Sequence, residues 1–149
     1  MLQGRNAEKL QSVKQACEEA GSPGVHIVEL ELSNIPGNFI FWCKTQHINV
    51  ELPKLVNETV AKFGGIDVLV NNAGMGVFGN LEDQTPEILE KVFGVNIKAP
   101  ILITQAAIEH LKKSRGAIVN VSSFSSYVRS NSKSQLKKHK MSVFKLFVK

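Results

Sequence analysis

The chain has 149 residues, enough for one domain with a core of its own and too few for two. With 43% hydrophobic and 21% charged residues it has the composition of an ordinary globular protein, and no apolar run approaches the roughly 20 residues of a membrane span. Cys17 and Cys43 are too few for a disulfide framework and lack CxxC spacing, so we expect free thiols in a cytoplasmic protein.

The formal net charge of +5 is unevenly distributed along the chain. Seven of the 18 Lys and Arg residues lie in residues 129–149, whereas all 13 acidic residues lie at or before Glu109. The rest of the chain therefore carries 11 basic and 13 acidic groups and is mildly acidic. This shift predicts a domain over residues 1–127 and a basic tail over residues 128–149.

Three interpretations of the basic tail remain open. It is a solvated charge run, an amphipathic anchor for anionic lipid or nucleic acid, or translated sequence that does not belong to the domain. In the last nine residues the apolar side chains leave Lys145 and Lys149 on a possible polar face, as in membrane-surface helices.

The first predicted element is a helix over residues 6–20, with Asn6 as its N-cap. Its apolar residues recur at helical spacing on one face: Leu10, Val13 and Cys17. A short strand is predicted over residues 25–30. Residues 34–50 fit neither the helical nor the strand period and exceed a usual connecting loop, so we interpret them as an insertion.

The second half predicts two helices and two strands. A helix is expected over 51–63 and a strand over 66–70; a longer helix begins at Thr85-Pro86 and is followed by a strand over 117–121. Both strands are nearly continuous apolar runs, which suit parallel strands buried on both faces. This order predicts an α/β fold, a doubly wound parallel sheet with right-handed crossovers and helices on both faces.

The most informative motif is Asn-Asn-Ala-Gly at 71–74, directly after the strand over 66–70. The carboxyl end of a parallel strand lies beside the ligand crevice of such folds. Small Ala and Gly let a ligand approach the backbone, and Asn amides can tie neighbouring strands together. The G-x-G-x-x-G pattern at 74–79 opens no helix, because the next one starts near Pro86, so we interpret it as a loop.

The segments IDVLVNNAG, VNIKAP and GAIVNVSS resemble motifs of the short-chain dehydrogenase/reductase family in their residues, order and spacing. The resemblance covers most of residues 1–33 and 51–126, and it implies a Rossmann-like fold. The family's first strand and glycine-rich cofactor loop have no counterpart here. In the family's order that strand lies between those at 25–30 and 66–70. We therefore expect a truncated, poorly stable sheet with exposed edges, in which only the strands at 66–70 and 117–121 keep their lateral contact.

The resemblance also implies a dinucleotide cofactor. The family's NNAG segment borders that cofactor, and Arg5 stands where NADP-preferring members place a base for the 2′-phosphate, so NADP(H) is expected over NAD(H). Glu31 takes the place of an Asp that contacts adenine. The expected cofactor-binding residues are Arg5, Glu31, Leu32, Asn72, Ala73 and Gly74.

For catalysis the resemblance implies two residues. Ser123, the second serine of NVSS, matches the serine that hydrogen-bonds the substrate oxygen, and Asn96 matches the asparagine of the family's proton relay. Pro100 has no N–H, so the carbonyl of Asn96 loses its usual helical donor and is free to hold a water. A plain helix kink is the alternative explanation.

The family's Tyr-x-x-x-Lys pair, which supplies the proton donor, has no match. Counting forward from Ser123 reaches Leu136, and leucine cannot transfer a proton. We therefore expect a parent activity of hydride transfer between NADP(H) and a carbonyl or alcohol, in a homo-oligomer, with this chain inactive. The alternative is a non-catalytic pseudoenzyme or fragment that binds a partner, lipid or nucleic acid through its tail. The histidines show no metal-ligand spacing, and no metal site is expected.

Overall fold

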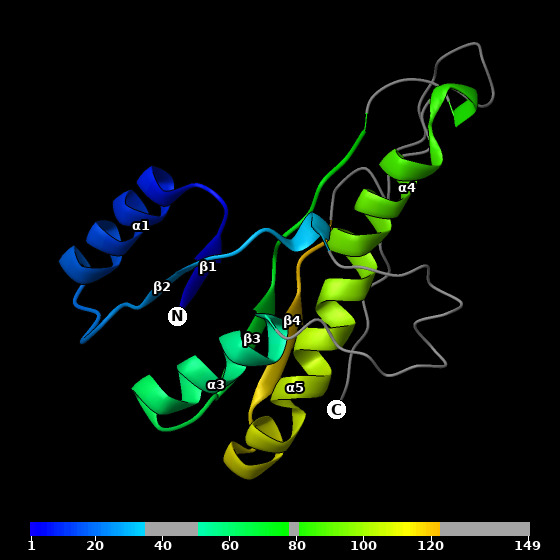
Figure 1. Cartoon of the computed structure of the whole chain (residues 1–149). Coiled ribbons are helices and arrows are strands. Elements are labelled where there is room, and N and C mark those ends of the chain that lie inside the picture. Colours follow the sequence, from blue (N-terminus) through cyan, green and yellow to red (C-terminus); the bar gives the residue numbers. More distant parts are fainter. Residues whose placement is uncertain (35–50, 78–80, 123–149) are drawn as a thin grey trace.

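The computed structural model describes residues 1–34, 51–77 and 81–122, and in these ranges it shows two pairs of parallel strands with helices packed against them (Figure 1). Strand β1 (Leu2–Gly4) pairs with β2 (Ile27–Glu29), and β3 (Val68–Asn71) pairs with β4 (Ala117–Asn120). The predicted α/β class with parallel strands is confirmed.

Strand β1 corrects one expectation. The strand predicted over 25–30 was expected to have no neighbour, but β2 lies in register with β1, with Leu2 opposite Ile27. Three residues next to a helix are too few to establish a period of two, so β1 is defined only by its pairing with β2. The expectation that only the second strand pair keeps its lateral contact is therefore wrong.

Helix α1 (Ala7–Glu19) connects β1 to β2 and covers one face of this pair. Its predicted N-cap is confirmed, because the side-chain oxygen of Asn6 accepts a hydrogen bond of 2.8 Å from the N–H of Lys9. Leu10 is buried against Gly4, where an added Cβ would lie 3.2 Å from the leucine side chain. Val13 is 46% exposed, so the predicted apolar face of the helix is only partly buried.

Helix α3 (Glu51–Phe63) has the predicted bounds. The predicted helix from Thr85 consists of α4 (Pro86–Phe93), a π-helical turn (Gly94–Lys98) and α5 (Ala99–Ser114). In the π-helical turn the N–H of Ala99 reaches back to the carbonyl of Gly94. The turn lies just before Pro100, which accounts for the local change in helix geometry. Short 3-10 turns occupy Leu32–Asn34 and Leu81–Asp83.

The main core lies on one side of the strands, beneath α3 and α5. Leu69 of β3 and Ile118 of β4 pack against it, together with Met1 and Val28 from the first strand pair. The fully or largely buried apolar residues of this cluster are Leu32, Leu52, Leu55, Val56, Ile66, Val95, Ala99, Leu102, Ile103, Ala107 and Leu111. Helix α1 packs on β1 and β2, with Leu10 against Gly4, and lies outside this core cluster.

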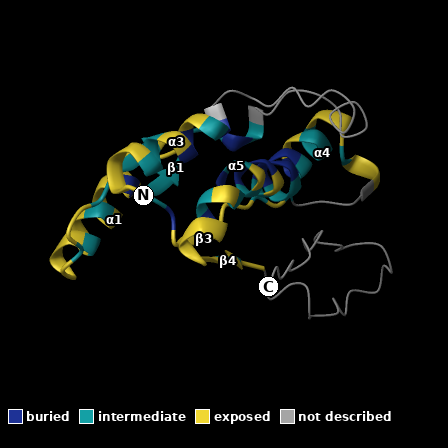
Figure 2. Cartoon of the chain, turned by 90° about the horizontal axis from the view of Figure 1, so that it is seen from below, coloured by how far each residue is buried: buried dark blue, intermediate teal, exposed yellow. Residues whose placement is uncertain are grey.

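The other face of β3 and β4 is uncovered in the described part of the chain (Figure 2). Four valines on this face are each between 46% and 55% exposed: Val68, Val70, Val119 and Val121. The expectation that both strands are buried on both faces is therefore wrong. The apolar runs are present, but no described helix packs on the valine side. We call these four residues the valine face.

A tight turn connects α5 to β4. The N–H of Gly116 donates to the carbonyl of Leu111 at 2.8 Å, and Arg115 adopts a left-handed conformation with φ of +54°, the geometry of a Schellman helix end. The hydroxyl of Ser114 donates to the carbonyl of Ile66 at 2.7 Å, which anchors the end of α5 beside the start of β3. Within the described residues no helix is both long and apolar enough to cross a membrane.

Candidate functional site

A cleft of about 620 Å³ lies between the two strand pairs. Its walls come from β1 and the residues after β2, from β3 and the loop that follows it, and from α3 and α5. All six residues predicted to bind the cofactor line this cleft: Arg5, Glu31, Leu32, Asn72, Ala73 and Gly74. They come from the carboxyl ends of three strands, where ligands of parallel α/β folds bind.

Arg5 and Glu31 form the charged rim of the cleft. The Arg5 guanidinium lies 3.7 Å from the Glu31 carboxylate, and the two side chains are 70% and 37% exposed. The N–H of Ser33 donates to Glu31 at 2.9 Å, and this hydrogen bond, with Arg5 close by, holds the pKa of the Glu31 carboxyl below its usual value. A pair this exposed contributes little to stability, so Arg5 is free to exchange Glu31 for another anion.

Gln3, which the sequence reasoning missed, stabilises this rim through a hydrogen bond. The side-chain amide of Gln3 donates to the carbonyl of Leu30 at 2.7 Å, joining the carboxyl ends of β1 and β2. This contact places Arg5 beside Glu31. No local pattern marks Gln3, because its role depends on a pairing between strands 27 residues apart.

The loop after β3 is held by Asn96. Its side-chain oxygen accepts from the N–H of Met75 at 2.9 Å, and its side-chain amide donates to the carbonyl of Met75 at 2.8 Å. Asn72, Ala73 and Gly74 are exposed to the cleft just before this attachment. Asn96, predicted for the proton relay, is thus brought to the same loop as the predicted cofactor residues, and its side chain fixes the path of that loop.

The expectation that asparagine amides tie neighbouring strands is confirmed at the last position of each strand. The side chain of Asn71 donates to that of Asn120 at 2.8 Å, and the two residues are in register at the ends of β3 and β4. A weaker contact of 3.5 Å joins Asn71 to Thr104 on α5. The sequence reasoning missed Asn120, because the register between the two strands follows from their pairing and from neither sequence alone.

Several predictions lie outside the described residues. These predictions concern Ser123, Tyr127, the basic tail and nearly all of the predicted insertion at 34–50. Residues 74–77 of the glycine pattern have no regular structure, and α4 begins only at Pro86, so the described part of the chain supports the loop interpretation.

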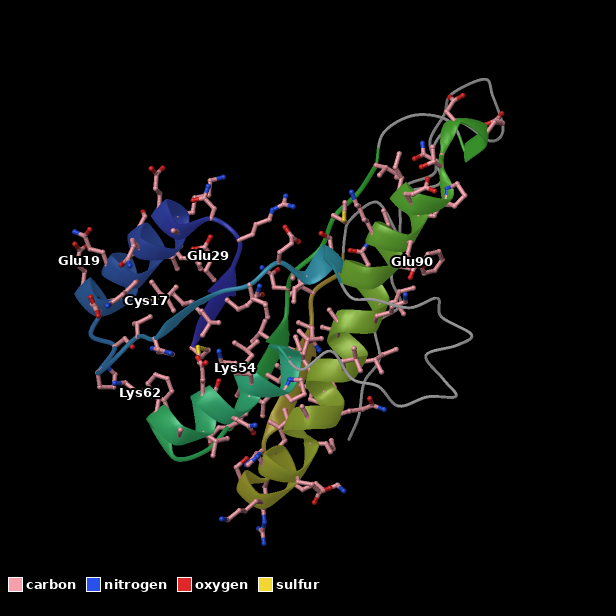
Figure 3. The ribbon with its side chains drawn as sticks, viewed as in Figure 1. Cys17, Glu19, Glu29, Lys54, Lys62 and Glu90 are labelled. Carbon is pink, nitrogen blue, oxygen red and sulfur yellow. The ribbon has the colours of Figure 1, made fainter. Side chains whose placement is uncertain are left out.

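An ion pair with one buried partner lies away from the cleft. Lys98 in the π-helical turn is fully buried and pairs with Glu90, which joins the two halves of the long helix. Figure 3 shows the position of Glu90 on α4. In the described ranges no group of three or more His, Cys, Asp or Glu side chains is arranged to hold a metal ion.

Parallel strands joined by helices, with a cleft at their carboxyl ends, define a Rossmann-type nucleotide-binding fold. Comparison with known proteins identifies the family within that class. The short chain dehydrogenase family model matches residues 1–135, and the chain belongs to this family of NAD(P)-dependent oxidoreductases.

Named relatives agree with this assignment. An 11-beta-hydroxysteroid dehydrogenase-like 4A of Arabidopsis thaliana is 35% identical over 124 residues, which are 82% of this chain and 36% of the relative. An uncharacterized oxidoreductase of Thermotoga maritima is 46% identical over 71 residues, 47% of this chain and 28% of the relative. The chain therefore spans about a third of the length of these curated relatives.

Solved structures show the same fold. A metagenomic short-chain oxidoreductase in complex with NADP has a TM-score of 0.69 at 28% identity, covering 87% of this chain and 52% of that chain. A short-chain dehydrogenase/reductase from Caenorhabditis elegans with cofactor has a TM-score of 0.68 at 28% identity, covering 87% of this chain and 45% of that chain.

Proposed function

We propose that this chain forms the cofactor-contacting part of an oxidoreductase that transfers hydride between NADP(H) and a small carbonyl or alcohol substrate. The observation that carries the proposal is the convergence of Arg5, Glu31 and the Asn72–Gly74 segment on one cleft at the carboxyl ends of parallel strands. The bound nicotinamide would supply the hydride. The residues of this chain would position it and exclude water from the cleft.

The described residues fit a dinucleotide with a 2′-phosphate. The Arg5 guanidinium is mostly exposed at the rim, and its planar fork of donors matches a phosphate. The small side chains of Ala73 and Gly74 leave the backbone open to a flat ligand, while Asn96 keeps that backbone in place. The NADP complex of a structural relative supports the choice of NADP(H) over NAD(H).

Catalysis in this proposal rests on Ser123, which would hydrogen-bond the substrate oxygen, and on the backbone carbonyl of Asn96, which would hold a water. The position that corresponds to the family's tyrosine is Leu136. Without a proton donor there, we expect the chain as given to bind cofactor fragments without turning over a ketone. A cytoplasmic location stays a prediction.

The role of Arg5 is tested with the fragments 2′,5′-ADP and 5′-AMP, which differ in the 2′-phosphate. In NMR titrations of the full chain, Arg5→Ala is expected to weaken binding of 2′,5′-ADP about tenfold, the loss of one charge-assisted hydrogen bond, and to leave 5′-AMP unchanged. Lys113→Ala, which removes an exposed cation in the last turn of α5, is the matched control. Equal affinity of the unmodified chain for both fragments would contradict the preference for NADP(H).

The basic tail favours a second candidate function, binding of anionic lipid or nucleic acid. Seven basic residues and no acidic residue lie in 129–149. Binding to vesicles that contain phosphatidylserine, or to duplex DNA, should then weaken steeply as salt is raised and disappear when residues 129–149 are deleted. Binding that survives the deletion would exclude the tail as its source.

A further inference from the structure

One wall of the cleft is attached to the π-helical turn Gly94–Lys98. Asn96, in the middle of this turn, accepts a hydrogen bond of 2.9 Å from the N–H of Met75 and donates one of 2.8 Å to its carbonyl. Met75 follows the Asn72–Gly74 segment, which lines the cleft. The position of this wall therefore depends on the direction in which the turn aims the side chain of Asn96.

The wall at the end of β2 rests on the same turn. The 3-10 turn Leu32–Asn34, which directly follows Glu31, packs against the π-helical turn (Figure 1). A Cβ added to Gly94 would lie 3.7 Å from the carbonyl oxygen of Ser33 and 3.8 Å from that of Leu32, so the two backbones approach closely. A change in the shape of the π-helical turn would therefore displace both walls together.

An ion pair spans the π-helical turn. The side chain of Lys98 is 0% exposed and pairs with Glu90, which is 44% exposed and lies eight residues earlier. In an uninterrupted α-helix, residues eight apart are rotated by about 80° around the axis. A π-helical turn contains one extra residue, so the eighth residue takes the angular place of the seventh, about 20° away. The two charged groups are thus aligned by the π-helical turn and would be misaligned in a regular helix.

The energetics of this pair favour a geometric role over a stabilising one. A fully buried ammonium group loses its hydration, and replacing a buried ion pair with apolar residues of similar volume is often neutral or favourable for stability. The irregularity itself is permitted by Pro100, which lacks an N–H. What the pair adds is a preference for the rotation in which Lys98 and Glu90 meet.

We propose that Lys98 and Glu90 are positioning residues for the cofactor site. Their pairing fixes the shape of the π-helical turn, and the turn holds both walls of the cleft in the arrangement that binds the dinucleotide. The inference rests on the proposed function, because it concerns cofactor binding. Neither residue is part of the cleft lining in the described part of the chain, so their effect on the cofactor passes through the turn.

The test compares Glu90→Gln with the matched variant Glu109→Gln in the full chain. Both substitutions remove one carboxylate that pairs with a lysine on the long helix, but the pair of Glu109 with Lys112 is exposed and lies in the second half of α5. Glu90→Gln is expected to weaken binding of 2′,5′-ADP about tenfold in NMR titrations, and Glu109→Gln should leave it unchanged.

Amide hydrogen exchange gives a second readout that does not depend on the cofactor. The N–H groups of Met75 and Ser33 report on the two walls, because they donate to Asn96 and Glu31. The N–H of Ala117, which donates to Asp67, reports on the strand pair. Glu90→Gln should speed exchange at Met75 and Ser33 about tenfold and leave Ala117 unchanged, since the opening is local.

A double variant separates positioning from a general loss of stability. Glu90→Gln alone takes the carboxylate away from a buried charge, which is destabilising in itself. Glu90→Gln combined with Lys98→Met removes that charge as well and fills the space with a flexible apolar side chain. The double variant should regain the urea midpoint of the unmodified chain, keep the fast exchange at Met75 and Ser33, and still bind 2′,5′-ADP weakly.

Three results would overturn the proposal. The first is normal exchange at Met75 and Ser33 in the double variant, which would show that the turn keeps its shape without the pair. The second is exchange at Ala117 that speeds up as much as at the two walls. The third is unchanged affinity for 2′,5′-ADP when both walls exchange fast. If the unmodified chain does not bind 2′,5′-ADP, the proposed function fails, and the exchange rates still decide whether the pair positions the walls.

Discussion

Replacing Gly116 by alanine is expected to lower the free energy of unfolding by about 3 kcal/mol, the upper range for forced overpacking. A Cβ at Gly116 would collide with the backbone carbonyl oxygen of Asp67 and lie 2.9 Å from both its carbonyl carbon and the Ser114 hydroxyl. Backbone atoms cannot rotate away as the end of a side chain can. The strain therefore falls on the first contacts between β3 and β4.

Those contacts begin the longer strand pair. The N–H of Ala117 donates to the same carbonyl of Asp67 at 2.9 Å, and the hydroxyl of Ser114 donates to the carbonyl of Ile66 at 2.7 Å. Urea unfolding followed by circular dichroism measures the loss. Gly65→Ala is the matched control, because no atom lies within 4 Å of a Cβ added there. Equal midpoints for both variants would show that the turn after α5 relaxes without cost.

The elements predicted correctly are those whose signals are local. Asn6 and Thr85 cap their helices through side-chain contacts to residues three positions ahead, so the cap can be recognised within one turn. Helix α3 has an apolar stripe that repeats over three turns, and it ends just before Gly64, whose φ of +82° suits glycine. Each signal is contained in the segment that it defines.

The errors arose where a residue's environment depends on distant parts of the chain. Strand β1 exists because β2 pairs with it, and three residues contain no period that reveals this. The valine face has the apolar sequence of a buried strand, but burial requires a helix on that side, and the run itself does not specify one. The partner of Asn71 was also missed, because it depends on the register between β3 and β4.

The candidate site was predictable to the extent that it follows strand ends. The six cofactor residues came from the resemblance, and the cleft brings them together because parallel strands deliver their carboxyl ends to one edge. The contacts that hold them, from Gln3 to Leu30 and from Asn96 to Met75, span 27 and 21 residues, and no local spacing marks them.

The second large effect is expected at Asn96. Asn96→Ala should lower the free energy of unfolding by about 2–3 kcal/mol, because two hydrogen bonds to the backbone of Met75 are lost and each contributes roughly 1–1.5 kcal/mol. Alanine has the higher helix propensity, so the substitution by itself would favour the helix. A loss of stability would therefore report on the loop after β3. Urea unfolding, with amide exchange of Met75, measures both consequences.

Asn96→Asp serves as the matched variant. The carboxylate keeps an acceptor for the N–H of Met75, 2.9 Å from the present oxygen, and loses the donor to its carbonyl. We expect a smaller loss of stability than with alanine and retained protection of the Met75 amide. If alanine and aspartate lower stability equally while Met75 exchange stays slow in both, the asparagine acts through the helix, and the loop that carries Asn72, Ala73 and Gly74 is held by other contacts. If only alanine accelerates Met75 exchange, the side chain of Asn96 is what keeps the wall of the cleft in position.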